Sequence, residues 1–372
     1  MLVVRRFSEA TEGGVQRVTD GLVDSLAERG HDVTYAREGD RLEQTAPGRW
    51  TVPLETPYSF RSLLKPSQAR RVGGALRAAY KLLRATRPDV VVFVYVTFPA
   101  LYFLALRPLF GYRLYLMGRG SDVLTKRGRS DRLTRRPLLR RADGVAAISE
   151  PVAAAMRDAA GHPDRDVEVI HNGTDLAFWN EVADVERSGG DAPTFVSVGT
   201  LRPIKGHAVL VDAFARVHAD FPRARLVFVG DGSLREALGD QAEALGIGGV
   251  VSFAGHLERP ALRERLARSD VFVLPSHNEG FGLALLESMA AGLACVGSDV
   301  GGVPDLLGGG AGVLVPPGDP AALAEALSAL AGDPARRRAL GASARARAQA
   351  FGWQEMVTKY EAFLELTTAK QR

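Results

Sequence analysis

The sequence of 372 residues contains a single cysteine, Cys295. One cysteine excludes an internal disulfide framework and any metal site built from several thiolates. The apolar neighbours of Cys295 predict a buried strand, so we interpret its thiol as part of a core. The seven histidines lack His-x3-His spacing, and the one Asp-x-Asp, at Asp164 and Asp166, is interpreted as a solvated turn. We therefore expect neither a bound metal ion nor a cofactor.

Only one stretch is apolar and long enough to imitate a membrane span. Residues 90–106 are uncharged, at the lower length limit for a transmembrane helix, and Pro99 interrupts them. A buried strand over 90–96, followed by a helix entered through Pro99, explains the stretch better. A secretion signal is not expected either, because Arg5 and Arg6 follow a short apolar start. These patterns predict a cytoplasmic protein.

Two stretches in the first half of the sequence are rich in basic residues and contain almost no acidic ones. Residues 61–87 contain eight basic residues and no acidic one, while residues 126–141 contain eight basic residues and Asp131. Residues 1–180 carry a net charge of +8 and residues 181–372 a net charge of −4. Such runs are most often solvated helix faces; an anionic membrane surface and an acidic or phosphorylated acceptor are the alternatives. We expect no nucleic-acid partner, because no recognition motif with interleaved aromatic residues accompanies the charge.

Short apolar runs alternate with amphipathic stretches along the chain, which predicts an α/β fold with parallel sheets. In the first half, strands are predicted at 2–4, 33–35, 90–96, 113–117 and 144–148, and a helix at 16–29. After the polar stretch 181–192 the pattern starts again, with strands at 194–198, 225–229, 250–253, 271–274, 294–297 and 312–315. We expect two doubly wound, Rossmann-like domains, 1–178 and 193–352, joined by a linker at 179–192 and facing a central cleft.

The run from Ser276 to Gly292 places two carboxylates around a predicted helix start. A strand is predicted directly before the run, and helical spacing begins at Leu283. Glu279 is therefore expected in the loop and Glu287 about one turn inside the helix, roughly 6 to 8 Å along its axis. Outward-pointing amides at the positive end of the helix dipole suit a diphosphate. The residues expected to supply them are Gly280, Phe281, Gly282 and Leu283.

Further motifs follow one another in a definite order. They are Gly13-Gly14, Ala146 to Glu150, Ile170 to Asp175, Val198 to Gly206, Val229 to Gly232, Phe253 to Gly255, the glutamate run, Gly301 to Asp305 and Gly312 to Asp319. In this order they make the chain resemble the retaining glycosyltransferases of the two-domain group called GT4, whose members carry such a glutamate run. The resemblance covers nearly the whole chain. It implies the GT-B fold, in which the last helix, here residues 353–372, crosses back to the first domain.

The resemblance implies roles for residues of the second domain. Glu279 is expected to orient the sugar hydroxyls, and Glu287 is expected to contact the ribose diol. Lys205, in a loop between a strand and a helix, is expected to neutralise diphosphate charge as the sugar leaves. The family has arginine where Thr200 stands, and Arg202 is the candidate to replace that arginine, with simple surface charge as the alternative.

In the first domain the candidates are Arg119 and the pair Gly13 and Gly14. The family often has histidine at the position of Arg119, and arginine cannot act as a base, so the expected role is positional or electrostatic. Asp122 is interpreted as a helix N-cap. The backbone amides of Gly13 and Gly14 are expected to approach the leaving phosphate or the acceptor.

The activity implied by the resemblance is transfer of a sugar, with retention, from a UDP- or GDP-linked donor to a hydroxyl group. The nucleotide sugar is then a substrate, and the acceptor is a glycan, a lipid-linked molecule or a small molecule. Lys205 and the helix amides would replace a metal ion. A hydrolase is disfavoured because Glu287 is expected to face the ribose rather than to pair with Glu279. Two alternatives stay open: a nucleotide-sugar epimerase and a non-catalytic nucleotide-sugar-binding protein, the latter suggested by Thr200 and Arg119.

Overall fold

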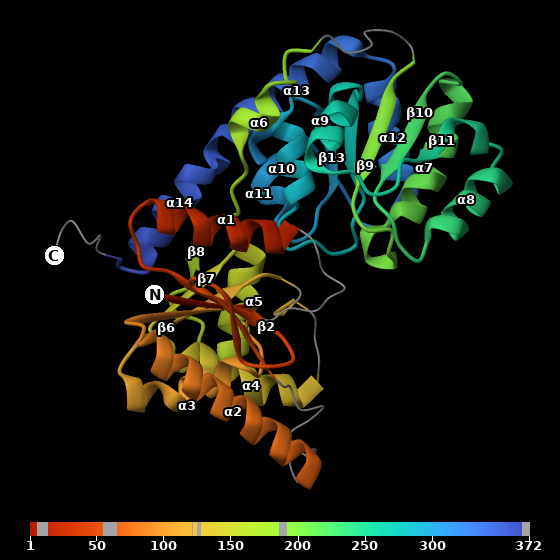
Figure 1. Ribbon diagram of the computed structural model, residues 1–372. Helices are drawn as coiled ribbons and strands as arrows, with labels where there is room; N and C mark the ends of the chain where they lie inside the picture. The colour runs from red at the N-terminus through yellow and green to blue at the C-terminus, as the bar shows by residue number, and fades with distance from the viewer. Residues whose placement is uncertain (6–13, 55–64, 121, 125–127, 186–191, 367–372) are drawn as a thin grey trace. The chain divides into compact units, whose positions relative to one another are not determined.

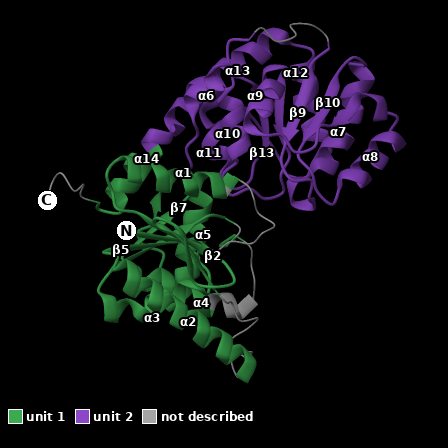
Figure 2. Cartoon of the chain, in the orientation of Figure 1, with its two compact units in different colours: residues 1–171, 356–372 green, residues 172–355 purple. Residues whose placement is uncertain are grey.

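A computed structural model describes the chain except for residues 6–13, 55–64, 121, 125–127, 186–191 and 367–372. The chain forms two compact units (Figure 2). Unit 1 consists of Met1–His171 and Met356–Arg372, and unit 2 consists of Asn172–Glu355. Within the described ranges, no helix combines the length and the apolar character that crossing a bilayer requires.

Unit 1 contains an eight-stranded sheet in the order β3-β4-β2-β1-β5-β6-β7-β8. The strands are β1 (Leu2–Arg5), β2 (Thr34–Glu38), β3 (Glu43–Ala46), β4 (Arg49–Val52), β5 (Val90–Val94), β6 (Arg113–Gly118), β7 (Gly144–Ala147) and β8 (Glu168–Val169). All neighbours pair in parallel except β3, which pairs antiparallel with β4. The central strands β1 and β5 are fully buried. The unbroken apolar sequence of β5 predicts this burial, whereas β1 ends in the buried charged residue Arg5.

The helices of unit 1 lie on both faces of this sheet, with α1 on one face and α2 and α3 on the other (Figure 1). They are α1 (Gly14–Glu28), α2 (Pro66–Thr86), α3 (Ala100–Phe110), α4 (Gly128–Arg141) and α5 (Glu150–Ala160). The ends of α5 follow from its sequence: a proline lies in its first turn, and Gly161 closes it with φ of 58°. The last helix, α14 (Trp353–Phe363), contributes its residues from Met356 onward to unit 1.

Contacts between distant parts of the chain hold α14 in unit 1. The Glu361 carboxylate pairs with Arg29 and lies 2.8 Å from Nε2 of His31. Phe363 meets the ring of Tyr115 edge-on at 5.2 Å between centroids. Both the start and the end of the chain therefore contribute to the same unit.

Unit 2 contains a six-stranded parallel sheet in the order β11-β10-β9-β12-β13-β14. Its strands are β9 (Thr194–Val198), β10 (Arg225–Val229), β11 (Val251–Phe253), β12 (Val271–Leu274), β13 (Ala294–Ser298) and β14 (Val313–Val315). Its helices include α6 (Leu176–Asn180), α7 (His207–Asp220), α8 (Arg235–Ala244), α9 (Arg259–Ala267), α10 (Leu283–Ala290), α11 (Val303–Leu307), α12 (Pro320–Ala331) and α13 (Pro334–Ala348).

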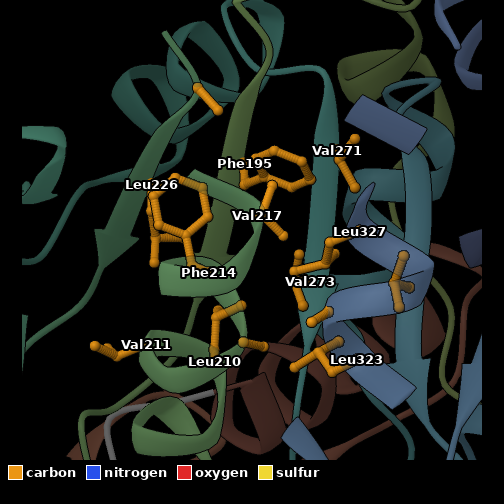
Figure 3. Packing of buried hydrophobic residues seen from close by; sticks show 14 of the residues in the cluster. Phe195, Leu210, Val211, Phe214, Val217, Leu226, Val271, Val273, Leu323 and Leu327 are labelled. Atoms are coloured by element: carbon orange, nitrogen blue, oxygen red, sulfur yellow. The ribbon is translucent and has the colours of Figure 1, made fainter. Parts of the chain in front are cut away.

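The core of unit 2 lies between the sheet and the helices α7 and α12. Figure 3 shows Phe214 of α7 and Leu327 of α12 near Phe195 and Val273 of the strands. The rings of Phe195 and Phe214 meet edge-on with centroids 5.7 Å apart. This packing fixes the central strand β9, and with it the start of the loop that follows β9.

The α/β class with two parallel, Rossmann-like sheets, predicted from the alternating pattern, is confirmed. The predicted strands of both units are present with ends shifted by no more than two residues, except at 33–35, where β2 extends to Glu38. The short strands β3 and β4 were not predicted, because their sequences, EQTA and RWTV, carry no run of apolar residues.

Candidate functional site

The candidate site of unit 2 lies at the carboxyl edge of its sheet. β9 and β12 are neighbours, yet the chain leaves β9 for β10 on one side and leaves β12 for β13 on the other. The strand order therefore reverses between β9 and β12. In open α/β sheets ligands bind outside the carboxyl ends of the strands at such a switch point. The loops after β9 and β12 carry Lys205 and Glu279, respectively.

The loop after β9 contains a short 3-10 turn, Pro203–Lys205, which ends at Gly206 with φ of 66°. A Cβ atom at Gly206 would lie 1.9 Å from the carbonyl oxygen of Pro275. Only glycine fits this close approach. The contact joins the loop after β9 to the loop after β12, and the His277 amide donates to the Ile204 carbonyl at 2.9 Å in the same place.

These joined loops bring two of the predicted residues into contact. Nζ of Lys205 lies 2.6 Å from Oε2 of Glu279, and the two side chains are 24% and 15% exposed. The Ser276 hydroxyl donates to the same carboxylate oxygen at 3.4 Å. A charge-assisted hydrogen bond in a partly buried position orders both side chains. Lys205 and Glu279 thus form one polar cluster at the switch point.

A third loop, after β13, supports the backbone of Glu279. Gly301 has φ of 52°, and a Cβ atom there would lie 1.5 Å from the Glu279 carbonyl oxygen. Glu279 is therefore held between the Lys205 side chain and the Gly301 backbone.

The start of α10 lies immediately after Glu279 and contains the other predicted donor-binding residues. Gly282 is the N-cap residue, with φ of 97°, and Leu283 is the first helical residue. The Leu286 amide donates to the Gly282 carbonyl, so the amides of the preceding turn have no acceptor within the helix. Phe281 is buried against the ring of Phe351, at 6.0 Å between centroids. This contact fixes how α10 begins.

The remaining candidates of unit 2 differ in exposure. Glu287 lies in α10 and is only 3% exposed. A ribose hydroxyl that contacts its carboxylate would therefore have to reach below the protein surface. Gly280 lies in the loop next to Glu279 and is partly buried. Arg202 is exposed at the start of the 3-10 turn, and its amide donates to the Thr200 carbonyl at 2.8 Å. Arg202 therefore shares the loop of Lys205.

In unit 1, Arg119 follows β6 and is only 3% exposed. Its Nη2 lies 3.8 Å from the Met117 sulfur. Burial raises the pKa values of Tyr95 and Tyr360, and the Arg119 charge opposes this shift in both. Arg119 therefore places positive charge near the buried Tyr360 phenol and the partly buried Tyr95 phenol. Gly14 is the first residue of α1, whereas Gly13 lies outside the described residues.

The interpretation of Asp122 as a helix N-cap is wrong. The next helix, α4, begins at Gly128, and the buried Asp122 carboxylate accepts the amides of Val96 and Arg119 at 2.7 and 2.9 Å. Burial raises the pKa of Asp122, while these backbone donors act in the opposite direction. The side chain thus ties the loop after β5 to the loop after β6. The sequence shows that Asp122 is of a residue type that often caps helices, but it does not show that the carboxylate binds the amides of Val96 and Arg119 instead.

Three residues of the cluster were not predicted as site residues: Ser276, Gly206 and Gly301. Gly206 and Gly301 belong to motifs that the sequence does show, but their function depends on positive φ and on carbonyl groups distant in sequence. Among the described residues, no group of three or more His, Cys, Asp or Glu side chains is arranged to hold a metal ion. Asp164 and Asp166 are exposed in the loop before β8.

Two family models match the chain. The model described as Glycosyltransferase Family 4 matches residues 12–178, and the model described as Glycosyl transferases group 1 matches residues 180–347. Together they cover most of the chain.

Curated relatives match over part of their length. A glycogen synthase of Mycobacterium tuberculosis is 34% identical over 223 residues, which are 59% of this chain and 53% of that protein. A D-inositol 3-phosphate glycosyltransferase of Streptosporangium roseum is 36% identical over 230 residues, which are 57% of this chain and 52% of that protein. The matched region spans about half the length of these curated relatives.

Solved structures share the fold over almost the whole chain. A sucrose-phosphate synthase from Thermosynechococcus elongatus has a TM-score of 0.78 at 22% identity, covering 98% of both chains. HepE of Anabaena, in complex with UDP-glucose, has a TM-score of 0.75 at 18% identity, covering 98% of this chain and all of the other. At these identities the likeness shows the fold alone.

Proposed function

Because the chain belongs to the glycosyltransferases that the family 4 and group 1 models describe, we propose that it transfers a sugar, with retention, from a nucleotide diphosphate sugar to a hydroxyl acceptor. The fold, two parallel-sheet units of the GT-B type, suits this activity. The observation that carries the proposal is the contact of Lys205 with Glu279 at the switch point of the second sheet.

Lys205 is proposed to bind the donor diphosphate while it keeps its hydrogen bond to Glu279. An ammonium group has three N–H donors. One of them reaches Glu279 at 2.6 Å, which leaves two for phosphate oxygens. The first-turn amides of α10, next to Glu279, add donors at the positive end of the helix. Arg202, in the same loop as Lys205, supplies further positive charge.

The proposed chemistry is departure of the nucleoside diphosphate with attack of the acceptor hydroxyl on the same face of the sugar, and an oxygen of the leaving phosphate takes up the hydroxyl proton. Lys205 and the α10 amides stabilise the charge that develops on the leaving group, without a metal ion. Glu279, restrained by Lys205 and Gly301, accepts hydrogen bonds from sugar hydroxyls. Glu287 is proposed to bind the ribose diol, Arg119 to act electrostatically in unit 1, and the backbone amides of Gly13 and Gly14 to approach the leaving phosphate or the acceptor.

The first donor to test is UDP-glucose, because the HepE structures contain UDP and UDP-glucose. GDP-linked sugars are the second group. The proposed acceptor hydroxyl belongs to a glycan, a lipid-linked molecule or a small molecule.

We further propose that unit 1 contacts the anionic inner face of a membrane through α2. This helix contains no acidic residue, and its basic side chains are exposed. They are Arg70, Arg71, Arg77, Lys81 and Arg84. Such a surface attracts anionic lipid by about 1 kcal/mol for each basic residue near it.

The first prediction concerns Lys205→Ala and Glu279→Ala. Each should abolish the rise in melting temperature that UDP-glucose or a GDP-sugar produces in the wild type. Each should also lower the rate of UDP release about 100-fold or more, since Lys205→Ala removes a donor to the developing charge and Glu279→Ala removes the acceptor that orients the sugar. Glu325→Ala, an exposed position on α12, should change neither measurement.

A wild type that binds neither UDP- nor GDP-sugars would contradict the proposal. Formation of C2 epimers without release of nucleotide would instead support an epimerase. Donor binding without any turnover across acceptors and water would identify a binding protein.

A further inference from the structure

A pocket of about 180 Å³ opens in unit 1, lined by residues of α1, β1, β2, β3 and β4. The residues that matter for its chemistry are Arg5, Gln16, Asp20, Tyr35, Arg37 and Arg49. None of them was a candidate from the sequence. All lie within unit 1, so the pocket is a feature of that unit alone.

Strand register places the arginines on one face of the sheet. Arg5 of β1 is the neighbour of Arg37 on β2, and Tyr35, two residues before Arg37, is the neighbour of Arg49 on β4. Side chains two residues apart on a strand share a face, as do those of directly paired residues. The Arg49 guanidinium lies over the Tyr35 ring, 5.2 Å from its centroid. The pocket lining therefore includes three guanidinium groups on one face of the sheet.

Buried positive charge lies at the base of this pocket. Arg5 is 2% exposed, and its Nη1 lies 3.5 Å from the Tyr35 hydroxyl. That hydroxyl is a neutral partner, because burial raises the pKa of Tyr35 to about 12. The Asp20 carboxylate faces the same hydroxyl, and Asp24 pairs with Arg49.

Arg37, Gln16 and Asp20 contribute further charged and polar groups to the pocket lining. Arg37 is exposed and extends the positive charge outward. Gln16 and Asp20 are one helical turn apart on α1 and are partly buried. A buried Gln16 side-chain oxygen has no hydrogen-bond partner among the residues that the structure describes. An amide and a carboxylate opposite guanidinium groups are suited to a ligand that carries hydroxyls together with an anion.

We propose that this pocket binds an acidic carbohydrate, in which a sugar ring carries a phosphate monoester or a carboxylate. Arg5 and Arg37 hold the anionic group with forked N–H donors, and Asp20 and Gln16 hydrogen-bond the ring hydroxyls. The inference deepens the proposed function and rests on it in one respect: the acidic carbohydrate is the acceptor. Binding itself does not need the donor, so it can be measured separately.

The test is calorimetric titration of the full chain with glucose 6-phosphate, glucuronic acid and glucose. We expect one or both acidic sugars to bind and glucose to bind at least tenfold more weakly. Arg37→Ala should weaken acidic-sugar binding by about tenfold or more, because a hydrogen bond to a charged group is lost. Arg41→Ala is the matched control, since the Arg41 side chain is 79% exposed and pairs with Glu43 outside the pocket. The control should bind as the wild type does.

Comparing the affinity for glucose 6-phosphate with that for glucuronic acid shows whether the pocket prefers a phosphate monoester or a carboxylate. Failure of both to bind, or equal binding by Arg37→Ala and wild type, would overturn the inference. Inorganic phosphate that binds as tightly as glucose 6-phosphate would overturn the carbohydrate part of it. Arg37→Ala should keep the thermal shift with UDP-glucose; if the wild type itself shows no donor shift, the proposed function fails instead, whatever the acidic sugars do.

Discussion

At the scale of single residues, Lys205 and His207 differ in burial and therefore in whether the side chain carries a charge at pH 7. Lys205 is partly exposed and paired with Glu279, whereas His207 is buried against the ring of Phe228. Burial, assisted by the nearby Lys205 charge, lowers the pKa of His207 from 6.5 to about 4. His207 is therefore neutral at pH 7 and belongs to the core beneath the loop of Lys205.

This difference predicts a pH dependence of stability. Because the folded-state pKa of His207 lies below its ordinary value, the unfolded chain takes up the proton first as the pH falls. The contribution of His207 to stability is complete above pH 6.5 and decreases as the pH falls toward 4. His207→Leu should reduce the loss of unfolding free energy between pH 7 and pH 5 by about 2 kcal/mol.

Urea unfolding at several pH values measures this loss. His256→Gln is the control, because the His256 side chain is 77% exposed. If His207→Leu and the control lose the same stability on acidification, the assignment to His207 is wrong.

The sequence predicted the residue types of the site better than their partners. The glutamate run predicts Glu279, and the family resemblance of the motif Val198 to Gly206 predicts Lys205, but their contact at 2.6 Å depends on which strands are neighbours. Asp122 was assigned to a helix because capping residues are recognised from local spacing, whereas its actual partners are the amides of Val96 and Arg119. The arginines around Tyr35 were not recognised, because strand register, and not sequence distance, brings them together.

At the scale of elements, the site depends on three loops that touch through glycines. Gly206 and Gly301 each approach a carbonyl group of the loop after β12 too closely for any side chain. The parallel sheets could be predicted from alternating strands and helices, since parallel strands need such crossovers. The loop contacts could not, because they depend on φ values and on distances of tenths of an ångström.

Gly301→Ala should therefore displace Glu279. The new Cβ would lie 1.5 Å from the Glu279 carbonyl oxygen, so we expect a loss of about 2 to 4 kcal/mol in unfolding free energy and loss of the thermal shift with UDP-glucose. Gly309→Ala is the control, since Gly309 also has positive φ, 71°, but open space around it. It should lose about 1 to 2 kcal/mol, the cost of a left-handed backbone for alanine, and keep donor binding. Equal effects in both variants would show that positive φ alone matters.

At the scale of the whole molecule, positive charge is concentrated in residues 1–180, with a net charge of +8, while residues 181–372 carry −4. If α2 contacts anionic lipid, vesicles with phosphatidylserine should sediment the protein at low salt, and neutral vesicles should not. Arg77→Glu with Lys81→Glu should abolish sedimentation. Arg336→Glu with Arg338→Glu, at exposed positions of α13 in unit 2, is the charge-matched control. Sedimentation that is unchanged by the α2 substitutions would exclude this contact.

The return of α14 to unit 1 has a consequence for synthesis on the ribosome. The part of unit 1 formed by residues from Met356 onward emerges only after all of unit 2 has been translated. Unit 2 can complete its sheet while the first sheet still lacks Glu361 beside Arg29 and His31, and Phe363 beside Tyr115. The unit whose strands are translated first is therefore the last to acquire all of its native contacts.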